Sequence, residues 1–285
     1  MGLSFADFCA SHGLIVGEPI PGRWMRCPTE DHPRSRNGAY RYIGDVGWAQ
    51  NWATMMAPAM WREDRPTGAA QARDAARLRA AAEREVQRLR QRQDKAAASA
   101  SALVQSCRLE EHNYLVMKGF SGLRGLVAED GSLVIPMRSS VTGRLVGAQQ
   151  IRWIESERRY DKRMLPGTRA KAAVLSLGMA HEERPWLVEG YATGLSVRAA
   201  MDLMRVRGPV IVCFSAGNLQ TIAQTRADAL VFADHDASGT GERIARATGR
   251  PWCMSPDIGD DANDMHRRHG IYKVAALMRP LMRSP

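Results

Sequence analysis

Residues 186–281 alternate between short apolar runs and longer amphipathic stretches. Short apolar runs bounded by Gly, Pro or acidic residues predict buried strands, and stretches with a period near 3.6 residues predict helices. The predicted strands are residues 186–190, 209–214, 229–236 and 251–254, and each precedes a predicted helix. This alternation predicts an α/β fold with a mostly parallel sheet and right-handed crossovers.

The preceding residues form three further predicted parts. In residues 106–180, apolar runs at 133–138 and 145–154 flank a Thr142-Gly143 turn, which predicts a hairpin in a β-rich segment. Residues 67–105 are rich in Ala, Arg, Glu and Gln, which predicts a long charged helix acting as a linker. Short alternating pieces predict a small β-rich domain for residues 1–66. We therefore expect four parts, namely residues 1–66, 67–105, 106–180 and 181–285.

Composition and charge narrow the class of protein. The 285 residues carry a formal net charge of +10, which favours a polyanionic partner. No apolar run reaches the roughly 18 residues needed to span a bilayer, and the first residues do not resemble a signal peptide, so we expect no membrane association and a cytoplasmic location. Five cysteines are scattered without a CxxC pair. The pattern Cys9, His12, Cys27, His32 lacks the two tight ligand pairs of zinc sites, so zinc is not expected.

Aromatic residues and arginines are interleaved in residues 1–66. The rings belong to Trp24, Tyr40, Tyr42, Trp48, Trp52 and Trp61, and the arginines are Arg23, Arg26, Arg34, Arg36 and Arg41. This mixture suits stacking on single-stranded bases, and hence template binding. A domain this small also needs large residues for its core. We expect most of the rings to lie in that core.

A basic stretch, Arg152–Lys171, begins within the predicted hairpin. It holds Arg152, Arg158, Arg159, Lys162, Arg163, Arg169 and Lys171 against Glu155, Glu157 and Asp161. Positive charge beside an acidic site is typical of enzymes that act on nucleic acids. A solvated hairpin face would have the same composition, so charge alone leaves both readings open.

Acidic residues follow three of the predicted strands, at the sheet edge where ligands bind in such folds. They are Glu189, then Asp234 and Asp236, then Asp257, Asp260, Asp261 and Asp264. Carboxylates packed together repel each other, and a divalent cation removes that conflict. Oxygen ligands suit Mg²⁺ or Mn²⁺, and two such ions can activate an attacking hydroxyl and stabilise leaving pyrophosphate. Gly190 and Gly239 would let the backbone approach phosphates closely.

Each acid also has a structural alternative. Asp236 or Ser238 could cap the helix that begins near Thr240, and Asp257–Asp261 could be a solvated loop. A glutamate that closes a buried strand, such as Glu189, is costly unless it is paired or binds a metal. Together these arguments favour metal binding.

This constellation resembles the Toprim domain of bacterial-type primases, topoisomerases, recombination-mediator proteins and some nucleases. That family has a strand ending in Glu-Gly, then a strand ending in Asp-x-Asp with a glycine soon after. Here these are Glu189-Gly190 and Asp234-His235-Asp236 with Gly239. The resemblance implies a Rossmann-like Toprim domain, preceded by a mixed α+β segment and the small β-rich domain.

The resemblance is more specific in other segments. The stretches 188–200, 213–223, 231–245 and 260–271 look like the Toprim primases of phages, conjugative plasmids and satellite-phage primase–helicases. The same primases are resembled by residues 22–45 and 112–120. They are also resembled by the hairpin at 133–151 and the following residues 159–167, and in that family these last two segments line the nucleotide and template groove. It implies a DNA primase that makes short primers on single-stranded DNA from nucleoside triphosphates, in replication of a phage, plasmid or other mobile element.

The resemblance also assigns roles to individual residues. Glu189 is a metal ligand or the general base for the primer 3′-hydroxyl, and Asp234 and Asp236 are metal ligands. Asp261 and Asp264 match an acidic element that supports metal or substrate. The basic residues Lys162 and Arg163 would bind triphosphate or template, and Arg152 is a further candidate for that work.

The sequence departs from the family at two places. Thr193 occupies the position of an aspartate in the main bacterial primases, and the cysteines of their zinc ribbon are missing. The chain has no GxxxxGK[ST], so it carries no Walker A helicase motif, and a separate helicase partner is possible. A monomer is our default expectation.

Two other functions stay open. A Toprim-type nuclease would use the same acids with water as the nucleophile. A non-catalytic single-stranded-DNA-binding or anti-restriction protein would keep only the fold.

Overall fold

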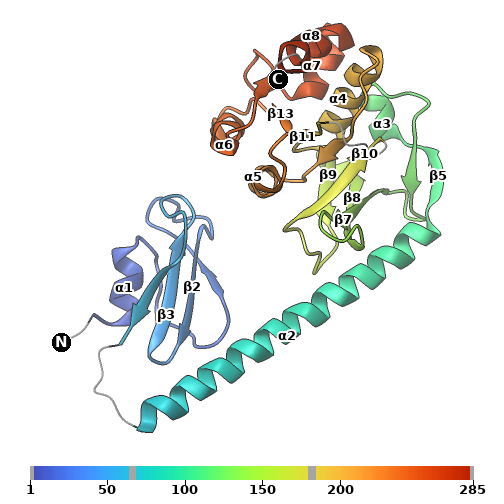
Figure 1. Cartoon of the computed structure of the whole chain (residues 1–285). Helices are drawn as coiled ribbons and strands as arrows, with labels where there is room; N and C mark the ends of the chain where they lie inside the picture. The colour runs from blue at the N-terminus through green and yellow to red at the C-terminus, as the bar shows by residue number, and fades with distance from the viewer. Residues whose placement is uncertain (1–2, 64–68, 179–183, 283–285) are drawn as a thin grey trace. The chain divides into compact units, whose positions relative to one another are not determined.

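A computed structural model describes residues 3–63, 69–178 and 184–282 (Figure 1), with side chains of the long helix described from residue 79 onward. The chain divides into two compact units, Met1–Arg90 and Gln91–Pro285. The domain boundaries expected after residues 66 and 180 fall outside the described residues, so these two boundaries stay predictions. None of the described helices is both long enough and apolar enough to cross a membrane.

The first unit contains one short helix and an antiparallel sheet. The elements are α1 (Phe5–Ser11), β1 (Met25–Cys27), β2 (Gly38–Ile43), β3 (Val46–Asn51) and β4 (Ala59–Arg62), with strand order β1-β2-β3-β4. The ring of Phe5 packs directly on Gly47, where an added Cβ would lie 2.1 Å from a ring carbon. Tyr40 and Trp61 join this core. Trp24 and Trp52, in contrast, are exposed, so the rings of this unit divide between core and surface.

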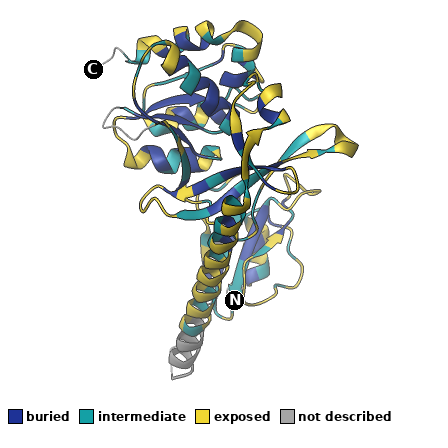
Figure 2. Ribbon diagram, turned by 90° about the vertical axis from the view of Figure 1, so that its right-hand side faces the viewer, coloured by how far each residue is buried: buried dark blue, intermediate teal, exposed yellow. Residues whose placement is uncertain are grey.

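The long helix α2 (Ala69–Ser106) runs from the first unit into the second. Val86 and Leu89 are about half exposed, so these apolar residues do not form a buried stripe (Figure 2). Near its end, Ala96 and Ala100 are buried, and Ala100 packs in a small core with strand residues of the second unit. The close approach needs a glycine at position 167, where an added Cβ would meet the carbonyl oxygen of Arg92 at 2.9 Å.

The second unit is built on one mixed sheet of ten described strands. Its first half contains β5 (Arg108–Glu111), α3 (Asn113–Met117), β6 (Arg124–Val127), β7 (Leu133–Ser139), β8 (Leu145–Ile154), a 3₁₀ turn (Glu155–Glu157), β9 (Arg159–Met164) and β10 (Ala173–Leu177). Its second half contains β11 (Trp186–Val188), α4 (Tyr191–Leu203), β12 (Val210–Val212), α5 (Ala216–Thr225), β13 (Leu230–Ala233), α6 (Thr240–Thr248), β14 (Trp252–Met254), α7 (Ala262–His269) and α8 (Ile271–Met282).

The strand order in this sheet is β14-β13-β11-β12-β10-β7-β6-β5, with β8 paired to β7 and β9. Strands β11 to β14 are parallel, as the alternating pattern predicts. Strand β10 is antiparallel to both β12 and β7. It therefore joins the β-rich segment and the parallel strands into one sheet, which the sequence did not indicate.

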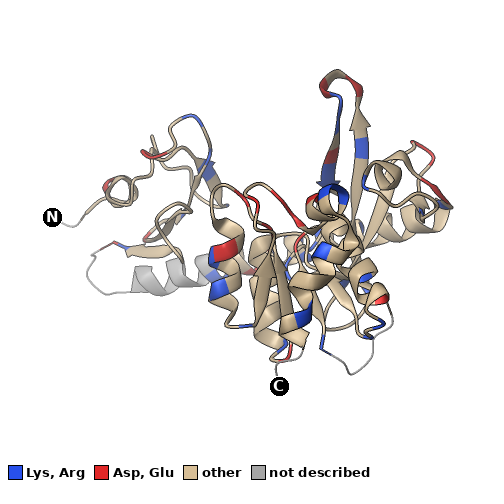
Figure 3. Ribbon diagram, turned by 90° about the horizontal axis from the view of Figure 1, so that it is seen from above, with Lys and Arg blue, Asp and Glu red and all other residues tan. Residues whose placement is uncertain are grey.

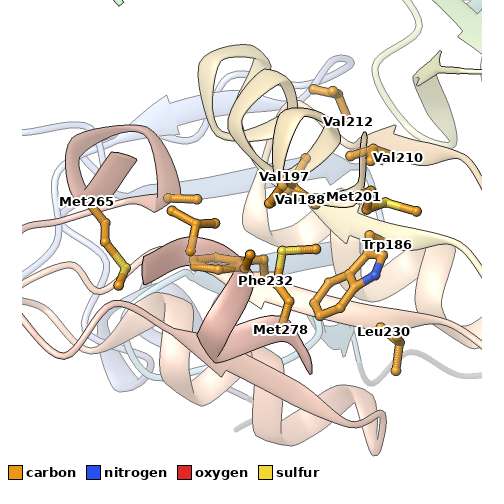
Figure 4. Packing of buried hydrophobic residues seen from close by; sticks show 14 residues of the cluster. Trp186, Val188, Val197, Met201, Val210, Val212, Leu230, Phe232, Met265 and Met278 are labelled. Atoms are coloured by element: carbon orange, nitrogen blue, oxygen red, sulfur yellow. The ribbon is translucent and has the colours of Figure 1, made fainter. Parts of the chain in front are cut away.

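Helices cover both faces of the parallel strands. Trp186 and Val188 of β11 pack with Phe232, Val197 and Met278 in the cluster beneath α4, α7 and α8 (Figure 4). The intervening Leu187 packs in a second cluster on the other face, with residues of α5 and α6. Strand side chains alternate between faces, so one short apolar strand contributes to two cores.

The helical segment after β14 is divided into α7 and α8, because Gly270 interrupts it with φ +81°.

Candidate active site

Two acidic residues directly follow neighbouring parallel strands. Glu189 comes one residue after β11, and Asp234 one residue after β13. In the parallel pair β11 and β13, Trp186 lies opposite Leu230 and Leu187 opposite Val231. The same register, extended by two residues, places Glu189 opposite Ala233. Glu189 and Asp234 therefore lie at the same edge of the sheet, as the strand-end argument predicts.

The carboxyl group of Asp234 lies in an unusual electrostatic environment. Burial, and then the negative charges of Asp261 and Glu189, raise its pKa to about 8, against a weaker opposing effect of Lys162. Its Oδ1 atom is buried and has no hydrogen-bond partner. A buried carboxylate oxygen without a donor is costly, so this atom is a natural ligand for a cation.

Asp236 has the opposite environment. Its carboxylate accepts hydrogen bonds from the Ser238 hydroxyl and backbone N–H, and from the backbone N–H groups of Thr240 (3.2 Å) and Gly241 (2.7 Å). The Ser238 hydroxyl and the Gly241 amide contribute most to lowering its pKa to about 2. The capping interactions at α6 are thus present, and Oδ2 accepts only the bond from Gly241. A carboxylate oxygen can accept a second bond, so capping leaves Asp236 able to bind a cation.

Glu189 is half-buried, and burial raises the pKa of its carboxyl group. A hydrogen bond from the backbone N–H of Ala216, at the start of α5, opposes that rise. The charge of Asp236 raises the pKa further and that of Lys162 lowers it. We use the name carboxylate cluster for Glu189, Asp234, Asp236 and Asp261, whose charges act on one another.

The loop after β14 holds the Asp-His-Asp segment in place. The backbone N–H of His235 donates to Asp260 O (2.9 Å), and its carbonyl accepts from the Gly259 N–H (2.6 Å). The His235 ring contacts Ser255 O through Nδ1 at 2.9 Å. Asp260 itself is buried and pairs with Arg268. Asp260 thus supports the segment through its backbone rather than through its carboxylate.

Asp261 and Asp264 have different surroundings. Asp261 begins α7, where its Oδ1 accepts from the N–H groups of Asn263 (2.7 Å) and Asp264 (2.9 Å). Its Oδ2 accepts from the Thr193 hydroxyl at 3.0 Å. Asp264 lies 3.8 Å from Lys118 Nζ and is not among the charges that act on Asp234.

The three predicted basic residues are separated. Lys162 and Arg163 are consecutive in β9, so their side chains lie on opposite faces of the hairpin. Lys162 pairs with the buried Ile151, has its Nζ 5.7 Å from the ring centre of Tyr114, and acts on the carboxylate cluster. Arg163 is exposed and paired with Asp161 at 2.5 Å. Arg152, also on that face, is paired with Asp130 at 2.7 Å. Basic and acidic residues mark the length of this hairpin in Figure 3.

The two predicted glycines play different structural parts. Gly239 precedes α6 with φ +68°, a conformation that favours glycine. Gly190 precedes α4 with an ordinary φ of −99°, and an added Cβ would lie 3.3 Å from the Thr193 hydroxyl. The tightest glycine is one that no prediction included. At Gly241, an added Cβ would lie 2.0 Å from the carbonyl oxygen of Asp234.

The residue types of the carboxylate cluster fit a divalent cation. Hard oxygen donors are what Mg²⁺ and Mn²⁺ prefer, and the unpartnered Oδ1 of Asp234 is such a donor. Across the described ranges, no three His, Cys, Asp or Glu side chains are already arranged to hold a metal. The chemistry of the cluster therefore fits the ion, and the cluster does not form a complete ligand shell by itself.

Comparison with protein families identifies the second half of this sheet. Residues 185–271 match the Toprim domain family. This chain contains a Toprim domain. The match includes the whole carboxylate cluster, both predicted glycines and Thr193.

Solved structures with similar folds include primase cores. They are the DnaG catalytic core (15% identity, TM-score 0.39, 60% of this chain and 59% of that one), the E. coli primase catalytic core (18%, 0.35, 53% and 52%) and a DNA primase domain from Pseudomonas aeruginosa (15%, 0.34, 63% and 57%). The chain thus spans between 52% and 59% of the length of these structures. A search of curated protein sequences gave no significant match.

Sequence reasoning gave no structural role to several polar residues that support the Toprim domain. Thr193, noted in the sequence only as a departure from the family, is buried and donates to Asp261. The side-chain amide of Asn263 donates to Lys118 O (2.8 Å) and Ser196 Oγ (3.1 Å), which ties α7 to the segment after α3. The signal was available in the sequence, since Thr193 and Ser196 are polar residues that stand among the apolar Ala192, Leu195 and Val197.

Proposed function

We propose that this protein is a DNA primase that makes short primers on single-stranded DNA by metal-dependent nucleotidyl transfer. The observation that carries the proposal is the buried Oδ1 of Asp234, which has no hydrogen-bond partner among the described residues and lies within a cluster of four carboxylates on which Lys162 also acts. The Toprim match supports a catalytic role for this edge of the sheet. The resemblance of the hairpin and of residues 159–167 to mobile-element primases favours primer synthesis over other Toprim activities.

The proposal gives each residue a chemical task. Glu189, Asp234 and Asp236 would hold Mg²⁺ or Mn²⁺, which when bound supplies positive charge to the attacking hydroxyl and to the departing pyrophosphate. Where Glu189 is not itself a metal ligand, its carboxylate accepts the proton of the primer 3′-hydroxyl. The 3′ oxygen then bonds to the α-phosphorus of the incoming nucleotide, and pyrophosphate leaves. Lys162 pairs with the triphosphate.

Two further residues position this cluster rather than react. Thr193 fixes the orientation of Asp261 through its hydroxyl, and Gly241 lets the Asp234 backbone approach α6. Asp264 supports the site through Lys118. In the same proposal Arg152 and Arg163 contact the template backbone on the outer face of the hairpin.

We also propose a cellular setting. The protein would act as a monomer in the cytoplasm, in replication of a phage, plasmid or other mobile element. In this setting a replicative helicase would open the duplex, and we propose that it is a separate partner.

The test is primer synthesis by the whole chain. Single-stranded DNA, labelled nucleotides and Mg²⁺ or Mn²⁺ are incubated with wild type, with an Asp234→Ala/Asp236→Ala variant and with Asp257→Asn. Asp257 is a matched control, because it belongs to the loop after β14 but pairs with His269 and does not act on Asp234. We expect short labelled products from wild type and Asp257→Asn, and none from the double variant.

Other outcomes separate the alternatives. Metal-dependent loss of the template without labelled products would indicate a Toprim nuclease. Equal DNA binding by wild type and the double variant, with neither product nor template loss, would favour a non-catalytic binding protein.

A further inference from the structure

The first unit carries two exposed tryptophans beside an arginine on its sheet. Trp24 and Trp52 are 40% and 45% exposed. The guanidinium carbon of Arg26 lies 4.0 Å from the centre of the Trp52 ring. We call these three residues the tryptophan–arginine patch.

The register of the sheet explains how the patch forms. Arg26 is on the edge strand β1 and pairs with Ala39 of β2, which in turn pairs with Gln50 of β3. Because Ala39 is small, the Arg26 side chain can reach across β2 to Trp52, which follows β3. Trp24 lies two residues before Arg26, and side chains two apart in an extended chain face the same way. Strand pairing therefore places Arg26, and the two tryptophans lie directly beside the ends of β1 and β3.

The core of the unit does not need these rings. Phe5, Tyr40 and Trp61 are buried with Cys9 and Leu14 on the opposite side of the sheet, under α1. Exposed tryptophan is costly to leave in water, and clustered exposed aromatics usually mark a binding surface. Two exposed tryptophans beside one cation thus need a partner to explain them.

Part of the same sheet face is already occupied. Arg41 donates to Gly22 O (3.1 Å) and pairs with Glu85 of α2 (2.7 Å). Trp24 and Trp52 keep their exposure with that contact in place. The Arg41–Glu85 pair therefore leaves both tryptophans exposed.

The segment that carries Trp24 and Arg26 has a net positive charge. Residues 22–41 contain Arg23, Arg26, Arg34, Arg36 and Arg41 against Glu30 and Asp31. Asp31 is engaged by the Asn51 side chain (3.1 Å) and by His32 (3.0 Å). An anionic partner with flat apolar groups matches both the charge and the rings, and unpaired bases on a phosphate backbone have that combination.

We propose that the tryptophan–arginine patch binds single-stranded nucleic acid, with bases stacked on Trp24 and Trp52 and a backbone phosphate paired with Arg26. The site lies outside the Toprim domain and does not depend on the proposed primer synthesis. Arg26 holds the Trp52 ring in one orientation, so little conformational freedom is lost when a base stacks on it.

The test measures binding of a fluorescein-labelled oligodeoxythymidine of about 20 nucleotides to the whole chain, by anisotropy without metal. Stacking on aromatic rings contributes strongly to single-strand affinity, so Trp24→Ala/Trp52→Ala should weaken binding at least about tenfold. The matched control is Met56→Ala/Met60→Ala, which removes two exposed apolar side chains of the same unit outside the patch. We expect its affinity to stay within about twofold of wild type, as for surface residues that touch no ligand. Thermal melting verifies that each variant folds.

Two variants keep the test sharp if the double variant does not fold. Trp24→Ala alone, which breaks no ring contact described for the unit, should still weaken binding, and Trp52→Tyr should retain most of the affinity because tyrosine also stacks. The affinity of each variant for a duplex of the same length should stay close to that of wild type, since the bases of a duplex are already stacked on one another.

Two results would overturn the proposal. One is wild-type affinity in folded Trp24→Ala/Trp52→Ala, which would leave the patch to a protein partner. The other is an equal loss for single strand and duplex. Asp234→Ala/Asp236→Ala should bind the oligonucleotide like wild type. If wild type makes no primers but the tryptophan variants still lose affinity for the oligonucleotide, the proposed primase activity is contradicted and the proposed binding patch is supported.

Discussion

Lys162 and Arg163 are adjacent in β9, yet Lys162 acts on the carboxylate cluster while Arg163 lies on the other face, paired with Asp161. A count of charges along the sequence cannot distinguish these two residues, because it treats them as one basic segment. The alternation of side chains between the two faces of a strand does distinguish them. The pair therefore separates a residue at the site from a residue of the outer surface.

This relationship predicts unequal effects on primer synthesis. Lys162→Gln should lower kcat/KM for nucleotide by on the order of 100-fold, as expected when one charged group on a reacting phosphate is lost. Arg163→Gln should change kcat/KM for nucleotide by no more than about threefold, because the contact proposed for Arg163 is with the template and its charge is exposed and already paired. Steady-state primer synthesis at fixed salt measures both. Equal losses would show that β9 presents both cations to substrate.

The raised pKa of Asp234 predicts that the metal-free protein becomes less stable to unfolding as the pH rises. A carboxyl group with a pKa of 3.8 in the unfolded chain and about 8 in the fold stabilises the fold fully below about 3.8, and that contribution is lost as the pH rises to about 8. Asp234→Asn removes the ionisation. Its melting temperature should therefore exceed that of wild type by a few degrees near pH 9, and by less near pH 5.

Calorimetry with and without Mg²⁺ completes that test. Added Mg²⁺ should raise the melting temperature of wild type and have little effect on Asp234→Asn, because a bound ligand stabilises the state that binds it. A variant that is less stable than wild type at every pH would contradict the repulsion inferred at this residue.

Thr193 offers a test of positioning. Thr193→Val keeps the shape and removes the hydroxyl that donates to Asp261, which leaves a half-buried carboxylate oxygen without that donor at a cost of about 1–2 kcal/mol. We expect a higher metal concentration for half-maximal primer synthesis and a small loss of stability. Thr193→Ser should restore the metal dependence. If Val and Ser behave alike, the hydroxyl is not what orients Asp261.

Gly241 and Gly239 should respond differently to alanine. At Gly241 the new Cβ would lie 2.0 Å from the Asp234 carbonyl, so the Asp-His-Asp segment must move and the response to Mg²⁺ should be lost. At Gly239 there is open space but φ is +68°, so the expected cost is about 1–2 kcal/mol of strain. Thermal melts with and without Mg²⁺ distinguish the two. A normal Mg²⁺ response in Gly241→Ala would contradict the close packing at Asp234.

Much of the Toprim half of the fold was predictable because its information is local. Each short apolar strand from Trp186 onward is followed by an amphipathic helix, and the strand-end rule then places Glu189 and Asp234 at one edge. The pairing of β10 with β7 and β12 was not predictable in the same way. It joins residues far apart in sequence, and no local period records which strands become neighbours.

The sequence was enough to predict the acidic residues of the candidate site, but not most of the residues that support them. Glu189 and Asp234 stand out because a charged residue beside a buried strand needs a reason. Thr193, Asn263 and Gly241 act through single hydrogen bonds or through the absence of a Cβ, and their residue types occur for many other reasons. The split of the aromatic rings between Trp61 in the core and Trp52 at the surface depends on register, which only the structure provides.

Strand β10 has a mechanical consequence. It is hydrogen-bonded to β7 on one side and to β12 on the other, so the hairpin that carries Lys162 and the strand that precedes Glu189 belong to one continuous ladder. A hinge between them would have to break backbone hydrogen bonds of that ladder. Lys162 and the acids are thus brought together when the chain folds, so the proposed reaction would not have to meet the entropy of assembling them in each cycle.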